Sequence, residues 1–162
     1  MTQRLKHLPI ELLAAAGSAA LLLAALGFQY LGGLAPCVLC IWQRWPHLLA
    51  VLAGLLSLRM KRAWVMGIGA LSAATSAGIG IFHTGVEMKL WQGLASCSGA
   101  LDVTQLSAED ALEAIMAAEV VKCDEIAWSL MGLSMASWNA LLSAGLAVLW
   151  VVAALRAKRT PL

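Results

Sequence analysis

Cys37 and Cys40 are the residues of this sequence best suited to carry out chemistry. They form a Cys-Val-Leu-Cys pair between two apolar stretches, so we expect them at the mouth of a membrane-spanning helix. Two cysteines at this spacing can open and close a disulfide with little backbone movement, and a helix N-terminus favours the thiolate form. The pair therefore predicts reversible thiol–disulfide chemistry at a membrane surface.

Cys97 and Cys123 are farther along the chain, and the residues alone leave two roles open for them. As a structural staple, a disulfide across a loop of about 27 residues would stabilise the fold by roughly 3–4 kcal/mol. As a shuttle, an exposed disulfide in a loop is open to attack by external thiols. A four-cysteine zinc site is a weaker alternative, because structural zinc sites usually supply two closely spaced pairs.

Arg44 is the most informative charge. It follows Cys40 by four residues and Cys37 by seven, so a helix would place all three on one face. An arginine inside a membrane span is costly and suggests function, here stabilising a Cys40 thiolate or polarising an acceptor's carbonyl oxygen. A lipid-headgroup contact is the alternative. His83 is predicted at the same depth as a hydrogen-bond donor or as an interface residue, and His47 as a site or packing residue.

Four apolar runs must position these residues, at 12–31, 41–58, 63–82 and 137–155. Each is close to the ~20 residues that cross ~30 Å of hydrocarbon. The 162 residues are 61% hydrophobic and 12% charged, which excludes an ordinary soluble domain. We predict an all-α four-helix membrane bundle, one domain over residues 1–162, with a long external loop at 84–136. The first run is expected to be an uncleaved anchor.

The basic residues predict the orientation of the bundle. Eight of the eleven flank the same ends of the apolar runs: Arg4, Lys6, Arg59, Lys61, Arg62, Arg156, Lys158 and Arg159. The positive-inside rule makes this side cytoplasmic, with both termini inside. All four cysteines are then expected on the external side, in a compartment where disulfides persist. The net charge of +2 is a difference between two polarised faces and gives no indication of nucleic-acid binding.

Local signals add detail to this outline. Pro36 suits a helix entry, so the second helix is expected to begin near Cys37 or Val38, and Pro46 to bend it. Ser107 is a candidate N-cap for an amphipathic helix in the external loop, whose apolar positions are Leu112, Ile115, Met116 and Val120. Aromatic residues are expected to anchor the bundle at its two interfaces. Trp64 and Trp150 belong to the inner belt, and Tyr30, Trp42, Trp45 and Trp138 to the outer one.

These features together resemble the bacterial inner-membrane disulfide bond formation protein B family. The segment Pro36-Cys37-Val38-Leu39-Cys40-Ile41-Trp42-Gln43-Arg44 closely matches the family signature P-C-V-L-C-I-aromatic-x-R. The match continues at Phe28-Gln29-Tyr30, His83, Cys97, Cys123, Trp128, Gly132-Leu133 and Trp138. The chain departs from well-known members in carrying Gln43 where they carry an acid, and in Pro46-His47. These departures bear on quinone preference rather than on the reaction class.

The resemblance implies a quinone-dependent protein-dithiol oxidoreductase with no metal. A reduced DsbA-like periplasmic oxidase would attack a Cys97–Cys123 disulfide, forming a mixed disulfide at Cys97. The Cys37–Cys40 disulfide would then reoxidise the loop pair. Cys40, as a thiolate beside Arg44, would pass the electrons to ubiquinone or menaquinone, with Arg44 and His83 as quinone-binding residues.

Two other classes compete with this interpretation. The vitamin K epoxide reductase-like family is also a four-helix quinone-linked enzyme, but its closely spaced active pair comes after its loop pair, the reverse of the order here. A non-catalytic membrane module, with its external loop held by a disulfide or zinc, is the second alternative. A catalytic pair should change state with quinone supply, whereas a staple would stay oxidised and a metal site would respond to chelators.

Overall fold

Four long helices form an antiparallel bundle in the computed structural model, which describes residues 9–60, 62–94, 107–110 and 121–159. The helices are α1 (Ile10–Tyr30), α2 (Val38–Ser57), α3 (Ala63–Glu87) and α5 (Met135–Arg159). Each is long and apolar enough to cross a membrane. The predicted all-α membrane bundle is therefore confirmed, and the chain is a multi-pass membrane protein.

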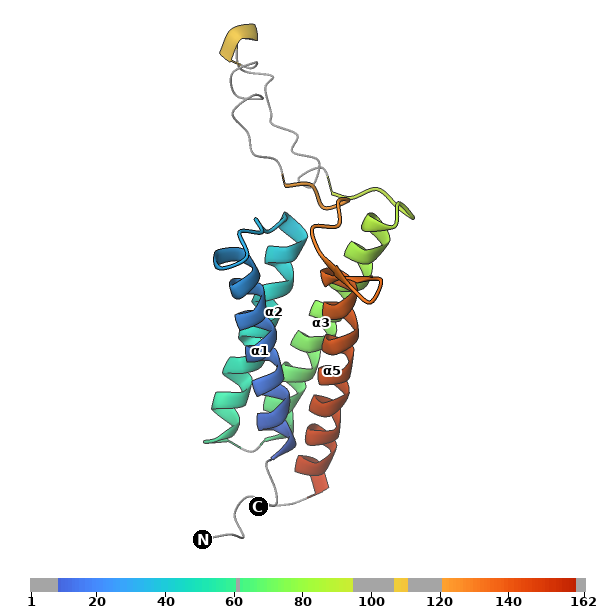
Figure 1. The fold of residues 1–162 in the computed structure, drawn as a ribbon. Helices are drawn as coiled ribbons and strands as arrows, with labels where there is room; N and C mark the ends of the chain where they lie inside the picture. The colour runs from blue at the N-terminus through green and yellow to red at the C-terminus, as the bar shows by residue number, and fades with distance from the viewer. Residues whose placement is uncertain (1–8, 61, 95–106, 111–120, 160–162) are drawn as a thin grey trace.

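The helices form a ring in which sequence neighbours touch. α2 packs on α1 and α3, α3 packs along α5, and α5 closes the ring against α1. The start of α1, the turn between α2 and α3, and the end of α5 lie at one end of the bundle, at the bottom of Figure 1. The first turn of α2 and the last turn of α3 lie at the opposite end, here called the outer end.

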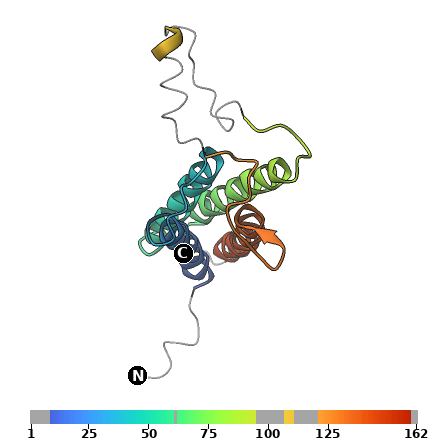
Figure 2. The same cartoon turned by 45° about the horizontal axis from the view of Figure 1, so that its top comes forward.

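A short hairpin leads into α5. β1 (Ser129–Leu130) pairs antiparallel with β2 (Leu133–Ser134), and the turn between them holds Met131 and Gly132 at positive φ. Two such residues are typical of a tight hairpin turn. The hairpin lies beside the start of α5 in Figures 1 and 2, where Ser134 Oγ accepts a hydrogen bond of 3.1 Å from the Ser137 amide. It was not anticipated from the sequence.

The second helix begins where the local signals place it. Cys37 is the N-cap of α2, and its sulfur accepts a hydrogen bond from the Cys40 amide at 3.2 Å. The helix ends otherwise differ from the apolar runs by a few residues, most of all in α3, which continues five residues beyond position 82. His83 and Glu87 lie in this extension and face inward, so their polarity does not end the helix.

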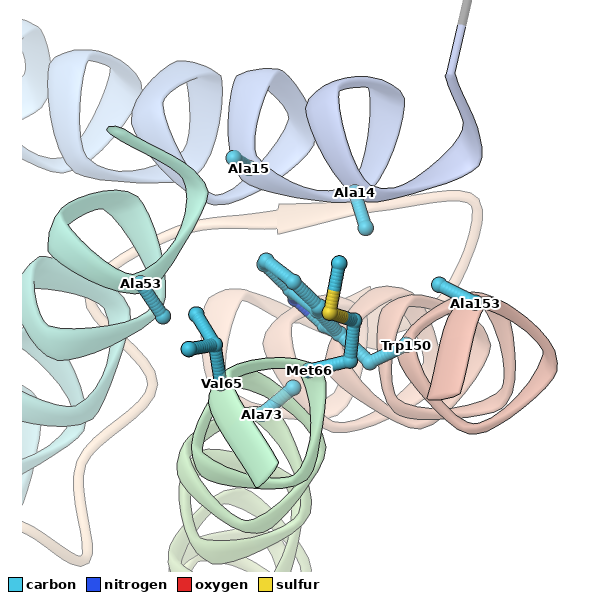
Figure 3. Packing of buried hydrophobic residues seen from close by; sticks show 8 residues of the cluster. All are labelled: Ala14, Ala15, Ala53, Val65, Met66, Ala73, Trp150 and Ala153. Carbon is cyan, nitrogen blue, oxygen red and sulfur yellow. The ribbon is translucent and has the colours of Figure 1, made fainter. Parts of the chain in front are cut away.

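The inner half of the bundle has a core of small side chains around one indole. Trp150 is fully buried among alanines of all four helices, together with Val65 and Met66 (Figure 3). The expectation that Trp150 anchors the inner interface is therefore wrong. Gly69 provides the space, because a Cβ added there would lie 2.4 Å from the Trp150 ring. Trp64, by contrast, is half exposed at the same end.

Candidate active site

The two cysteines of the closely spaced pair face each other at the start of α2. Both are free thiols, and their sulfur atoms are 2.7 Å apart, so a disulfide could form with little movement. Cys37 is buried, whereas Cys40 is partly exposed. The hydrogen bond from Cys37 to the Cys40 sulfur, together with burial, raises the pKa of Cys37. Cys37 therefore keeps its proton, and Cys40 is the sulfur that accepts a hydrogen bond.

Cys123 lies next to this pair. It is disulfide-bonded and fully buried, and it packs in one cluster with Cys37, Leu39 and Val86. Cys97 falls outside the described residues, so the predicted Cys97–Cys123 pairing stays a prediction. An exposed ion pair between Lys89 and Asp124 joins the segment after Cys123 to the end of α3. The Lys89 ammonium lowers the pKa of the Asp124 carboxyl.

Part of the external loop also lies outside the described residues. The amide of Asp110 donates a hydrogen bond of 3.2 Å to Ser107 Oγ, which is the contact that the predicted N-cap requires. Residues 111–120, which carry the predicted apolar face of the amphipathic helix, are not among those described.

His83 connects the two cysteine regions from within α3. Its Nε2 lies 3.6 Å from the Cys37 sulfur and 3.2 Å from the Cys123 carbonyl oxygen. A carboxylate oxygen of Glu87 lies 3.9 Å from the same nitrogen. His83 is 3% exposed, so it lies in the core of the site rather than at the membrane interface.

Arg44 lies on the wall of a cavity that Cys40 also lines. Its Nη1 donates a hydrogen bond of 2.5 Å to Gln29 Oε1 on α1. Its Nε is buried and has no hydrogen-bond partner within the described part of the chain. Cys37 does not line the cavity, so the prediction that Cys37, Cys40 and Arg44 share one face holds only for Cys40 and Arg44. Cys40 and Arg44 face the cavity, and Cys37 faces His83 and Cys123.

The cavity has a volume of about 410 Å³ and opens between α1, α2, α5 and the hairpin. Aromatic rings of Phe28 and Trp128, whose centroids are 5.0 Å apart, form part of its largely apolar wall. Trp138, predicted as an outer anchor, also lines it. Its polar lining residues are Cys40, Gln43, Arg44, His47, His83 and Asn139. An apolar pocket with a few convergent polar groups is typical of sites for small organic ligands.

Gln43 and Asn139 are site residues that the sequence analysis did not identify as such. Gln43 Nε2 lies 3.1 Å from His83 Nδ1, and its Oε1 accepts a hydrogen bond of 2.7 Å from Asn139 Nδ2. Asn139 Oδ1 lies 3.0 Å from His47 Nε2, which places His47 in the site. A polar amide inside the apolar run of α5 was the signal available for Asn139.

The same geometry bears on the zinc alternatives. A four-cysteine site needs four thiolates, and Cys123 is disulfide-bonded here. Cys37, Cys40 and His83 do offer three ligand atoms within 4.8 Å of one another. The dithiol form therefore has ligands of the kind that a soft metal ion prefers.

Known proteins match almost the whole chain. The family described as disulfide bond formation protein DsbB matches residues 8–153. A disulfide bond formation protein B from Verminephrobacter eiseniae is 35% identical over 136 residues, which cover 80% of this chain and 76% of the relative. A disulfide bond formation protein B 2 from Pseudomonas aeruginosa is 34% identical over 131 residues, covering 77% of each chain.

A third relative, a disulfide bond formation protein B from Shewanella frigidimarina, is 29% identical over 142 residues, covering 85% of this chain and 84% of its own length. No solved structure matches the chain at a significant level. The matched residues span the cavity, Cys37, Cys40 and Cys123 together. The chain belongs to the DsbB family of disulfide bond formation proteins.

Proposed function

We propose that this protein oxidises a DsbA-like periplasmic dithiol oxidase and passes the electrons to a membrane quinone. The observation that carries the proposal is the division of one cysteine pair between two environments. Cys37 packs beside Cys123, and Cys40 lines the cavity with Arg44. A pair in this position can receive electrons on one side and release them on the other.

The proposed first steps are two disulfide exchanges. A partner thiolate attacks the Cys97–Cys123 disulfide and leaves as an oxidised protein after a mixed disulfide at Cys97. A loop thiolate then attacks the Cys37 sulfur, the Cys37–Cys40 bond breaks, and Cys40 departs as a thiolate. The second loop thiol displaces Cys37 from this mixed disulfide, which re-forms the loop disulfide and leaves Cys37 and Cys40 reduced. The packing of Cys37 against Cys123 favours Cys37 as the sulfur that is attacked.

The cavity suits a quinone head group as the final acceptor. It is largely apolar, it lies at the outer end of the membrane spans, and the buried Arg44 Nε has no acceptor among the described residues. When bound, a quinone takes up two electrons and two protons. The two electrons come from Cys37 and Cys40, whose sulfurs become a disulfide, and the two protons are those that the partner dithiol releases during the exchanges. Arg44 and His83 are the residues proposed to hold the ring oxygens; ubiquinone and menaquinone both fit this chemistry.

The energetics also call for an acceptor of this kind. DsbA is known as a strong oxidant with a potential near −120 mV, so a glutathione pool near −200 mV would only reduce it. The established DsbA–DsbB–quinone route keeps the bacterial periplasm oxidising. The proposal assigns this chain to that route.

We further propose a single domain in the bacterial inner membrane, with both termini in the cytoplasm and the cysteines on the periplasmic side. Support comes from the position of Arg59, Arg62, Arg156 and Lys158, which flank the inner ends of α2, α3 and α5. The positive-inside rule places such an end in the cytoplasm.

The direct test is quinone reduction by the purified protein with a reduced DsbA-type partner. Cys40→Ser should lower the rate by about 1000-fold or more, because the electron-releasing thiol is lost. Thr75→Ala, which removes an exposed hydroxyl of α3, is the matched control and should keep the parental rate. A parental rate in Cys40→Ser would contradict the proposal.

A metal-binding, non-catalytic module is the second candidate, and the ligand cluster of Cys37, Cys40 and His83 is the observation that favours it. Chelation separates the two candidates. Our proposal expects EDTA to leave quinone reduction unchanged. A protein that contains stoichiometric metal, and that loses stability when the metal is removed, would support the module instead.

A further inference from the structure

A buried cluster of polar side chains lies between α2, α3 and α5, beneath the cysteine pair. It consists of Gln43, His47, Ser76, Asn139 and Ser143. Polar groups inside a membrane span are costly and usually mark a site. The proposed function uses neither His47 nor Asn139, although both line the cavity.

The backbone carbonyl of Leu39 fixes the orientation of two amides in this cluster. A carbonyl oxygen can only accept, so the Gln43 atom at 3.0 Å from it is assigned as the Nε2 donor. Gln43 Oε1 then faces Asn139, which must donate to it through Nδ2 at 2.7 Å. Asn139 Oδ1 is thereby turned toward His47 Nε2, at 3.0 Å.

Two serines support the same assignment for His47. Ser76 Oγ donates its one proton to the backbone carbonyl oxygen of Gln43 at 3.1 Å. Ser143 Oγ donates its own proton to Asn139 Oδ1 at 3.3 Å. Both hydroxyls are thereby left able to accept from His47 Nε2, which lies 3.1 Å from each. Asn139 Oδ1 is fixed as an acceptor and both serines are compatible with that role, so Nε2 carries the proton of the neutral ring.

His47 Nδ1 must then be an unprotonated acceptor. The side chain is 2% exposed, and Nδ1 has no hydrogen-bond partner within the described part of the chain. A buried acceptor without a donor is unfavourable unless a ligand or water supplies one. Nδ1 itself has almost no accessible surface, but the His47 residue borders the cavity, so the cavity is the side from which such a donor would reach it.

A quinone ring has carbonyl oxygens, which accept hydrogen bonds, whereas its reduced form has hydroxyl groups, which donate them. We propose that His47 is a binding residue for the reduced ring, accepting a hydroxyl hydrogen at Nδ1, so that the cavity holds quinol more tightly than quinone. This inference rests on the proposed function.

The preference has a consequence for electron flow. Tighter binding of the reduced form makes the bound acceptor a stronger oxidant than the same molecule free in the membrane. A tenfold preference corresponds to about 30 mV for a two-electron couple. Asn139 acts as a positioning residue, because its Oδ1 holds the proton of His47 on Nε2.

The test measures the affinities of decyl-ubiquinone and its quinol, under argon, by calorimetry on the full chain. A Cys40→Ala background prevents turnover through the cysteine pair. His47→Gln can still donate toward Asn139 but has no acceptor at the Nδ1 position. We expect quinol affinity to fall about three- to tenfold, the value of one hydrogen bond, with quinone affinity unchanged.

Thr75→Ala is the control. It removes an exposed hydroxyl of α3 outside the cluster and away from the cavity, so the quinol preference should remain. Asn139→Ala, which releases the His47 ring from its fixed tautomer, should lower the preference and provides a second variant if His47→Gln does not fold. Equal loss of both affinities in either variant, or no loss, would overturn the role of His47. If the background protein binds neither ring form, the proposed function fails as well.

Discussion

The two halves of this bundle are built from the same four helices but in opposite ways. The inner half packs Trp150 among alanines and glycines, and its core cluster consists of apolar residues. The outer half holds a cavity, two free thiols and a connected set of amides, imidazoles and hydroxyls. The comparison indicates that the inner half provides stability, while the outer half keeps polar groups in place for chemistry.

The largest expected change in stability comes from removing the centre of the inner half. Trp150→Ala should lower the free energy of unfolding by ~3–5 kcal/mol, because it leaves a cavity where the indole meets all four helices. Thermal unfolding in detergent measures this change. Trp64→Ala, at a half-exposed position of the same end, should have a much smaller effect. If the Trp150→Ala protein that remains folded no longer reduced quinone, the packing of the inner half and the chemistry of the outer half would not be independent.

Removing a polar side chain from the outer half should affect quinone binding more than the stability of the fold. Arg44→Met removes the charge and the hydrogen bond to Gln29, and we expect the KM for quinone to rise about 10- to 100-fold. Steady-state kinetics with varied quinone measures it. Arg62→Met, which removes the same kind of side chain at the inner end, is the control and should leave KM unchanged. An unchanged KM in Arg44→Met would remove Arg44 from the site.

Two glycines of α3 give a finer test of the inner packing. Gly69→Ala places a Cβ 2.4 Å from the Trp150 ring and should destabilise the protein by ~1–3 kcal/mol. Gly67→Ala, on the same helix, meets nothing within 4 Å and should be neutral or stabilising by up to ~1 kcal/mol. Melting temperatures of the two variants compare them directly. Similar values would mean that the inner half packs loosely.

The smallest effect concerns the two thiols of the reduced protein. Because the pKa of Cys37 is raised, its thiolate fraction is lower than that of an ordinary thiol at every pH. We expect iodoacetamide to modify Cys40 about tenfold faster than Cys37, with Cys37 still slow as pH rises from about 7 to 9. Mass spectrometry gives both rates, and unfolded protein, where they should be similar, is the control. Faster modification of Cys37 would reverse the assigned roles.

The sequence predicted most accurately what depends on local pattern. Helix spans follow from runs of apolar residues, and the start of α2 follows from Pro36 and the cysteine spacing. The four-residue spacing of Cys40 and Arg44 correctly placed these two residues on one side of α2, where both line the cavity. These features need no knowledge of which helices meet.

Features that depend on pairing of distant helices were missed or wrong. The hydrogen bond between Gln43 and Asn139 joins residues 96 positions apart, and nothing in either helix by itself indicates it. Trp150 looked like an interface anchor because its partners, Gly54 and Gly69, lie on other helices. α3 continues beyond its apolar run because His83 and Glu87 have polar partners from distant parts of the chain inside the bundle.

The central claim is that electrons leave the outer half through Cys37 and Cys40 to a quinone. The most direct measurement counts products when reduced DsbA-type partner is mixed with this protein under argon, with quinone present or withheld. The account predicts one quinol formed for each partner disulfide, and, without quinone, oxidation that stops once the protein's own disulfides are used. Continued oxidation of the partner without quinone, or quinol formed by a protein lacking Cys40, would contradict it.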